Sequence, residues 1–238
     1  MGLALTAACS SQHPQKEVTA QEAVADNDDT TVYGLACDGC TDTIIVVLRN
    51  IEGNPDTFNI LEASRQRQIF GRPNIGDQLA LVRNAEDSTV ADLVIDLEEL
   101  KATWCYEAKP TLRKRADISE QEVQRMLANM PAEEKEKMMT PREYGFQIKG
   151  DNEMMPVGLA YRAQTSDDES PFEYPPLKRY RQWRLNNGRL ILTETQRDSL
   201  GNTHPVSSDT AELVLLAPDT LILRFADGER GYYRRTEN

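Results

Sequence analysis

The chain has few of the residues on which catalytic and metal sites are usually built. Its 238 residues include only two histidines, His13 and His204, and four cysteines. Neither histidine stands in a context typical of a buried general base, and the sequence contains no glycine-rich phosphate loop, no H-E-x-x-H and no G-x-S-x-G pattern. We therefore expect a protein without enzymatic activity, cofactor or bound metal ion.

Long apolar runs and positive charge are also scarce. No segment approaches the roughly 20 apolar residues of a membrane-spanning helix, so we expect a soluble body. The 27 Lys and Arg residues are outnumbered by 39 Asp and Glu residues, which gives a formal net charge of -12. Because such a charge repels phosphate groups, we expect no nucleic-acid partner.

The first residues read MGLALTAA and end at Cys9, after which the chain becomes polar. This pattern resembles the end of a bacterial lipoprotein signal, in which a peptidase cuts before a cysteine that then carries lipid. The resemblance implies lipidation of Cys9, a membrane partner through that anchor, and a place in the bacterial cell envelope at the outer membrane. Residues 10–30 lack apolar periodicity, so residues 1–30 are interpreted as a signal remnant and flexible tether. The alternative is an N-terminus with an incidental cysteine.

Residues 31–98 are interpreted as a small β unit. Short β-branched segments alternate there with turn residues, and the strands are expected at residues 31–36, 43–48, 57–63, 78–82 and 89–97. Five short strands in this arrangement resemble a barrel of the oligonucleotide/oligosaccharide-binding (OB) type. The segment 30–98 holds five Arg and no Lys against eleven Asp and Glu, which is unsuitable for binding a nucleic-acid backbone.

The motif Cys37-Asp38-Gly39-Cys40 lies between the first two expected strands. Asp-Gly is a preferred pair in tight hairpin turns, and cysteines opposed across a hairpin end are close enough for a disulfide. We interpret the motif as a structural disulfide, with a redox-active pair as the alternative. A zinc site would need two further ligands, and Cys105, His13 and His204 are distant in sequence.

Residues 99–238 are interpreted as a second, larger β unit. Eight strands are expected, at residues 103–107, 144–149, 156–163, 179–185, 189–195, 211–216, 220–225 and 230–235. The pairs Asn187-Gly188 and Asp227-Gly228 are typical of hairpin turns. The pattern predicts an eight-stranded meander barrel, whose interior is either filled by side chains or holds one small ligand.

The start of this second unit reads LKATWCY, with Trp104 in its first strand. With this tryptophan in the first strand, residues 99–238 resemble the lipocalin-like lipoproteins common in Bacteroidetes. The resemblance implies that Trp104 closes one end of the barrel and that an arginine of the last strand, Arg234 or Arg235, packs over it.

A helical insertion interrupts the barrel strands. Ser119 and Glu122 form a capping-box pattern, apolar residues follow at helical spacing up to Pro131, and a second short helix is expected over residues 132–139. Six of the seven methionines lie in or just after this insertion, at Met126, Met130, Met138, Met139, Met154 and Met155. They are interpreted either as the face that docks a helix on the sheet or as an adaptable lid over an apolar ligand.

Residues 178–184 read KRYRQWR and alternate charge with aromatic rings. Period-two alternation places Arg179, Arg181 and Trp183 on one face of a strand, so that an arginine could enter the barrel and pair with an acidic ligand.

The sequence leads to one favoured function and two alternatives. The favoured one is a non-catalytic, lipid-anchored envelope protein that binds a small apolar ligand in its C-terminal barrel. The first alternative is an interaction subunit of an envelope complex, with a solidly packed barrel. The second is thiol-redox or metal handling by Cys37 and Cys40.

Overall fold

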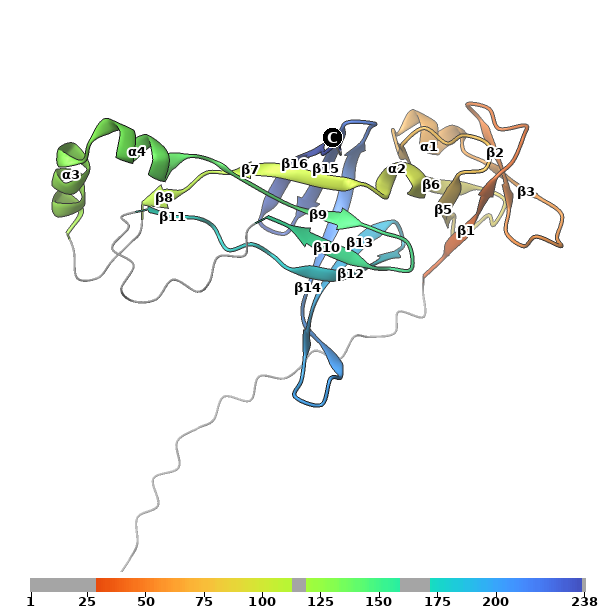
Figure 1. Ribbon diagram of the computed structural model, residues 1–238. Helices are drawn as coiled ribbons and strands as arrows, with labels where there is room; N and C mark the ends of the chain where they lie inside the picture. The colour runs from red at the N-terminus through yellow and green to blue at the C-terminus, as the bar shows by residue number, and fades with distance from the viewer. Residues whose placement is uncertain (1–28, 113–118, 159–171, 237–238) are drawn as a thin grey trace, which may run out of the picture.

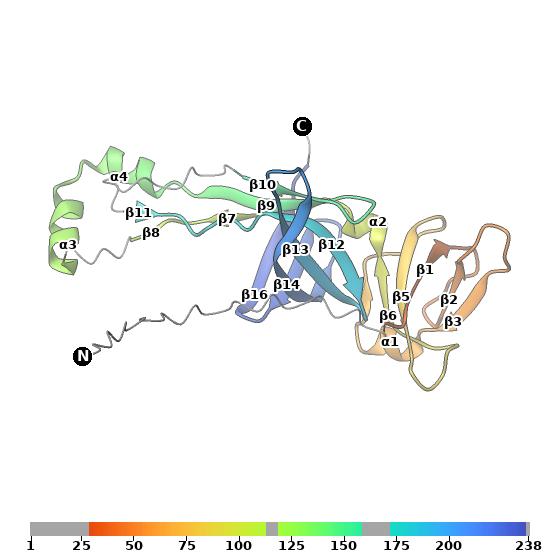
Figure 2. The ribbon, with the colours of Figure 1, turned by 90° about the horizontal axis from the view of Figure 1, so that it is seen from below.

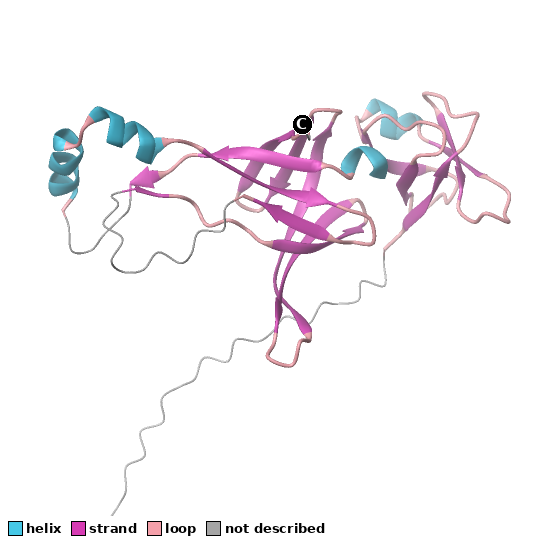
Figure 3. Cartoon of the chain, viewed as in Figure 1, coloured by secondary structure: helices cyan, strands magenta, loops and turns pink. Residues whose placement is uncertain are grey.

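The computed structural model describes residues 29–112, 119–158 and 172–236, and strands dominate it (Figure 3). The strands form a six-stranded sheet A, an eight-stranded sheet B and a two-stranded pair. The expected fold class is confirmed: the chain is mainly β, with a small N-terminal β unit followed by an eight-stranded barrel that carries a helical insertion. Cys9 and residues 10–28 of the predicted tether lie outside the described residues, whereas Asp29 and Thr30 are described and hydrogen-bond with Asn187.

Sheet A has the strand order β3-β2-β1-β5-β6-β4. Its strands are β1 (Thr31–Ala36), β2 (Ile44–Leu48), β3 (Asp56–Asn59), β4 (Ile69–Phe70), β5 (Gln78–Arg83) and β6 (Ala91–Asp96). A parallel bridge joins Asn59, the last residue of β3, to Val90, which immediately precedes β6, so the two ends of this part of the sheet meet. Five of the strands therefore follow one another around a small, incompletely closed barrel in the order expected of the OB-like type.

Two of the strands predicted in this unit extend beyond the C-terminal ends of the observed strands. Residues 57–63 were expected to be one strand, but β3 ends at Asn59 and α1 (Leu61–Arg65) follows. Residues 89–97 were also expected to be one strand, but β6 ends at Asp96 and α2 (Leu97–Leu100) follows. In both places a side-chain oxygen accepts a backbone N–H just beyond the strand, from Leu61 to Asn59 Oδ1 at 3.0 Å and from Glu98 to Asp96 Oδ1 at 2.9 Å. These local bonds favour a helical turn over continued pairing.

Sheet B contains the predicted meander. Its strands are β7 (Thr103–Ala108), β9 (Arg142–Ile148), β10 (Met154–Val157), β12 (Tyr180–Asn186), β13 (Arg189–Arg197), β14 (Thr203–Leu216), β15 (Thr220–Phe225) and β16 (Gly228–Arg234). The last strand pairs with the first through Tyr233–Cys105 and Arg234–Trp104. Between β10 and β12 the ring is bridged by Glu153 and Gln182, which leaves the barrel nearly closed.

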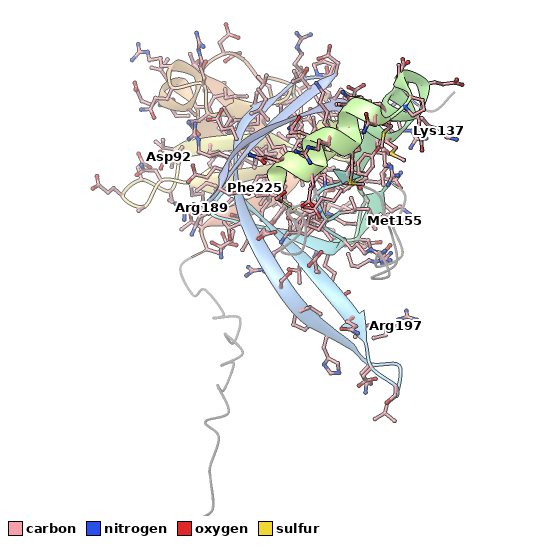
Figure 4. All side chains as sticks on the ribbon, turned by 90° about the vertical axis from the view of Figure 1, so that its left-hand side faces the viewer. Asp92, Lys137, Met155, Arg189, Arg197 and Phe225 are labelled. Atoms are coloured by element: carbon pink, nitrogen blue, oxygen red, sulfur yellow. The ribbon has the colours of Figure 1, made fainter. Side chains whose placement is uncertain are left out.

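The turn between β12 and β13 has the backbone that its sequence predicts. Asn187 and Gly188 adopt φ values of 45° and 75°, so both residues are left-handed, as a two-residue hairpin turn requires. The β13–β14 ribbon then runs beyond the barrel to Arg197, far from Phe225 (Figure 4). His204 lies in β14 of this ribbon, and its Nε2 is 3.0 Å from Asp198 Oδ2.

The insertion between β7 and β9 forms an arm. It carries β8 (Thr111–Leu112), α3 (Glu120–Asn129) and α4 (Ala132–Met139), and β8 pairs with β11 (Phe172–Glu173). The capping box of Ser119 and Glu122 is confirmed. Both views place α3 and α4 at the outer end of the arm, away from the barrel (Figures 1 and 2). Within the described ranges, no helix has the length and apolar character needed to cross a membrane.

The two β units meet in a shared hydrophobic cluster, and sheet A also has a second cluster of its own. Leu97 and Leu100 of α2 lie in the same buried cluster as Trp104 and Phe146 of the barrel. Sheet A contributes three residues to this cluster, namely Phe70, Ala80 and Ile95. The N-terminal unit therefore packs against the barrel end at which β7 begins, and it leaves the opposite end uncovered.

Candidate functional site

The barrel is closed at the end that faces α2. Trp104 is fully buried there and donates its indole N–H to the Leu100 carbonyl at 2.9 Å. The guanidinium carbon of Arg234 lies 5.0 Å from the centroid of the Trp104 ring, and Arg234 Nη2 donates to the Glu99 carbonyl at 2.5 Å. Of the two arginines expected at this position, Arg235 instead lies outside, 3.1 Å from Glu143.

Above this closure, the lower half of the lumen is filled by leucines. Four of them have no exposed surface, namely Leu190, Leu192, Leu221 and Leu223. The register places them on one face, because Leu190 pairs with Ala211 and Leu221 with Tyr232, which are themselves buried. This half of the barrel has the solid packing of an ordinary protein core.

The upper half of the lumen is different, because it encloses a hollow of about 770 Å³ that opens at the mouth. Aromatic rings form much of its wall, from Tyr106, Phe146, Tyr180, Phe225 and Tyr232. The rings of Tyr106 and Tyr232 meet edge to face with centroids 5.5 Å apart, and those of Phe146 and Tyr232 lie 5.0 Å apart. A hollow of this size and character can accept a small organic molecule.

Polar groups are placed at a few points of this wall. The Tyr180 hydroxyl donates to Asp209 Oδ2 at 2.5 Å, and Lys178 Nζ lies 3.2 Å from the same oxygen. Burial and this carboxylate raise the pKa of Tyr180 far above its ordinary value. Burial also raises the pKa of Tyr232 to about 12. Both phenols are therefore neutral hydrogen-bonding groups at physiological pH rather than nucleophiles.

A second cation of the wall is Arg230 of β16. Its guanidinium carbon lies 5.2 Å from the Phe225 centroid and 5.7 Å from the Tyr106 centroid. The sequence predicted a lumenal arginine among residues 178–184, and Arg230 was not predicted to enter the lumen. The signal was present in the alternation of Arg230, Tyr232 and Arg234 along the last strand.

The arginines of β12 do not enter the lumen. Arg179, Arg181 and Arg184 are exposed, whereas Tyr180 and Trp183 are both buried. Strict period-two alternation cannot place residues 180 and 183 on one face, but a register shift between Tyr180 and Gln182 does so. The prediction of a lumenal arginine in this strand was wrong for that reason.

The six methionines form neither a lid nor a docking face. Met154 is buried in the barrel core, but Met126, Met139 and Met155 are more than 40% exposed. Met130 and Met138 are half-buried, and α4 contains no buried residue. In Figure 4, Met155 and Phe225 lie on separate strands of the barrel. Among the described residues that line the hollow there is no methionine.

Cys37 and Cys40 are free thiols, so the predicted disulfide is absent from the structure. The turn directs the two sulfur atoms to different backbone carbonyls, since Cys37 Sγ donates to Leu35 and Cys40 Sγ donates to Cys37. Val46 N–H also donates to Cys40 Sγ at 3.3 Å. Within the described part of the chain, no group of three or more His, Cys, Asp or Glu side chains is arranged to hold a metal ion.

Cys105 is the third described cysteine. It lies in β7 next to Trp104 and is fully buried. Burial raises the pKa of its thiol to about 11, so the thiolate is scarce at neutral pH and the side chain behaves as a small apolar group.

No family model, curated protein or solved structure matches this chain. The hollow at the barrel mouth is therefore interpreted from its own geometry. Aromatic rings form much of its wall, and those of Phe146, Tyr180 and Tyr232 belong to the buried cluster of the barrel. The hollow opens at the end of the barrel opposite α2.

Proposed function

We propose that this chain is a non-catalytic, cell-envelope binding protein that receives a small, largely apolar ligand in the mouth of its C-terminal barrel. The observation that carries the proposal is the hollow of about 770 Å³ between aromatic side chains. Burying a ligand against such rings removes apolar surface from water, which stabilises a complex by about 25 cal/mol per Å². The buried rings of Phe146, Tyr180 and Tyr232 support the site, because packed side chains limit the ordering cost of binding.

The proposed envelope location depends on Cys9. Two or more acyl chains on this cysteine would hold the body at a membrane, whereas one chain would give only weak binding. The resemblance to lipocalin-like lipoproteins supports this part of the proposal. When the full-length gene is expressed with labelled palmitate, we expect the label in the parent and not in Cys9→Ala. Equal labelling of the two would remove the anchor from the proposal.

An uncharged dye tests the binding function. N-phenyl-1-naphthylamine fluoresces in apolar surroundings, and the only two tryptophans, Trp104 and Trp183, are both buried in the barrel. We expect saturable binding with energy transfer from tryptophan to the dye. Phe225→Ser removes a ring from the hollow and is expected to weaken binding at least fivefold, equivalent to about 1 kcal/mol.

Tyr33→Ser provides the matched control, because it removes an exposed ring from sheet A. We expect the control to bind the dye as the parent does. Binding that does not saturate, or that falls equally in the two variants, would contradict the proposal.

An interaction subunit remains the second candidate, and it is favoured by the two extensions of the barrel. The β13–β14 ribbon ends in Leu200, which is 85% exposed, and α4 carries no buried residue. A partner that covers the ribbon or the arm would bury these side chains without using the hollow.

A further inference from the structure

Arg230 is placed in the barrel lumen by the register of its strand. It pairs with Leu223 of β15, and Leu223 is a fully buried lumen residue. Cross-strand partners project from the same face of a sheet, so Arg230 projects to the inside. Its guanidinium lies near the rings of Phe225 and Tyr106, at 5.2 and 5.7 Å from their centroids.

The contacts of Arg230 leave part of its hydrogen-bonding capacity open. A guanidinium has five N–H groups. The charge of Arg230 lies close enough to the Tyr232 phenol to oppose the rise that burial causes in its pKa. Among the described residues, the ion-pair partner of Arg230 is Asp227, whose Oδ2 lies 3.6 Å from Nη2, a separation longer than a hydrogen bond, and the Asp227 side chain is 74% exposed to water. A well-hydrated carboxylate at this distance attracts the guanidinium only weakly, so it compensates little of the positive charge of Arg230.

The other described cation of the hollow has a closer carboxylate partner. Lys178 Nζ lies 3.2 Å from Asp209 Oδ2, and that oxygen also accepts the Tyr180 hydroxyl at 2.5 Å. Lys178 and Asp209 therefore form an ion pair at one side of the mouth. Among the described cations that line the hollow, Arg230 is the one whose guanidinium lies near the aromatic rings.

From this asymmetry we infer that the ligand of the hollow is an amphipathic anion, which places a carboxylate or similar oxyanion on Arg230 and an apolar body against the aromatic wall. The inference rests on the proposed function and specifies its ligand class. A planar guanidinium suits an oxyanion because two parallel N–H groups can donate to two oxygens.

The acidic surface does not exclude an anionic ligand. The net charge of -12 belongs to the whole chain, and at physiological ionic strength charges are screened over about 8 Å. At the mouth itself the four charged side chains balance, with Lys178 and Arg230 against Asp209 and Asp227. Local contacts with Arg230 therefore decide the preference for an anion.

Two dyes of the same shape test the inference on the full-length protein. 8-Anilino-1-naphthalenesulfonate carries the aromatic body of N-phenyl-1-naphthylamine together with a sulfonate. The readout is the association constant of the anionic dye divided by that of the neutral dye, so that a general loss of binding cancels. We expect Arg230→Gln to lower this ratio at least tenfold, and Arg230→Lys to lower it less because the charge is retained.

Arg224→Gln is the control, since it removes the same charge from an exposed position of β15 that is paired with Glu229 and Glu212. We expect it to leave the ratio within twofold of the parent. Urea midpoints of all variants verify that each is folded. If the neutral dye binds and Arg230→Gln leaves the ratio unchanged, the inference is overturned and the proposed function survives. If neither dye binds the parent, both are overturned.

Discussion

The two halves of the barrel lumen are built on the same strands but have opposite interiors. Strand β15 contributes the fully buried Leu221 and Leu223 to the lower half and the half-buried Phe225 to the mouth. Strand β16 contributes Arg234 to the closed end and Arg230 to the mouth. Branched aliphatic side chains fill the space between strands, whereas planar rings at the rim leave a hollow.

This division separates stability from binding along the barrel axis. The leucines of the lower half belong to one buried cluster with Leu97 and Leu100 of α2 and with Phe70, Ala80 and Ile95 of sheet A. At the rim of the mouth, Phe225 and Arg230 are only partly buried, so these two side chains can differ without loss of the fold. A side chain of the lower half should therefore matter for stability, and one of the mouth for ligand selection.

The largest expected effect is in the lower half. Leu192→Ala should lower the free energy of unfolding by about 2–5 kcal/mol, because it leaves a cavity in a fully buried position. Phe225→Ala should cost less than about 2 kcal/mol, although it removes more atoms, since the hollow beside it already opens to water. Urea unfolding followed by tryptophan fluorescence measures both.

A common slope of the two urea transitions would show that both variants unfold from the same compact state. If Phe225→Ala proves as costly as Leu192→Ala, the mouth belongs to the packed core and the contrast between the two halves fails.

The closed end offers a sharper comparison between adjacent arginines. Arg234→Ala removes the contact with Trp104 and the hydrogen bond to the Glu99 carbonyl, and it should cost about 2–3 kcal/mol. Arg235→Ala breaks an exposed ion pair with Glu143 and should cost under about 1 kcal/mol. Differential scanning calorimetry should therefore show a lower Tm for the first variant than for the second. The reverse order would mean that the arginine over Trp104 does not close the barrel.

Much of the fold could be predicted because the chain repeats a simple local pattern. Segments such as Thr220–Phe225 alternate buried and partly exposed residues, and left-handed turns are marked by Asn187-Gly188. Neighbouring strands joined by such turns form a meander. The eight barrel strands therefore followed from local sequence, with errors mainly at their ends.

The elements that were missed depend on competition between local bonds and strand pairing. Asn59 and Asp96 each end a strand because a side-chain oxygen accepts a backbone N–H beyond it. The strand β4 has only two residues, Ile69 and Phe70, and pairs in parallel with β6. So short a segment has no periodicity of its own, and its pairing depends on the surrounding sheet.

The candidate site was harder to predict than the fold. Its wall is assembled from β7, β9, β12, β14, β15 and β16, so it exists only after the barrel has closed. A single register shift at Tyr180 decided which residues of β12 face inward. Which of several arginines enters the lumen therefore depends on register, and strict period-two alternation favoured the wrong strand.

The smallest expected effect concerns the mouth tyrosine Tyr232 and appears only at alkaline pH. Burial raises its pKa from the ordinary value of 10.0 to about 12, so between these two values the folded chain keeps a proton that the unfolded chain loses. This contribution to stability is complete below pH 10 and disappears as the pH rises toward 12. Tyr232→Phe should cost about 1 kcal/mol at pH 8, where only the polar interaction of the phenol with Arg230 is lost, and should make the decline above pH 10 less steep. Urea unfolding of the parent and the variant at pH 8, 10 and 11 measures both effects. A parallel decline in Tyr232→Phe and the parent would show that water reaches this phenol, and that the hollow extends deeper than its aromatic floor.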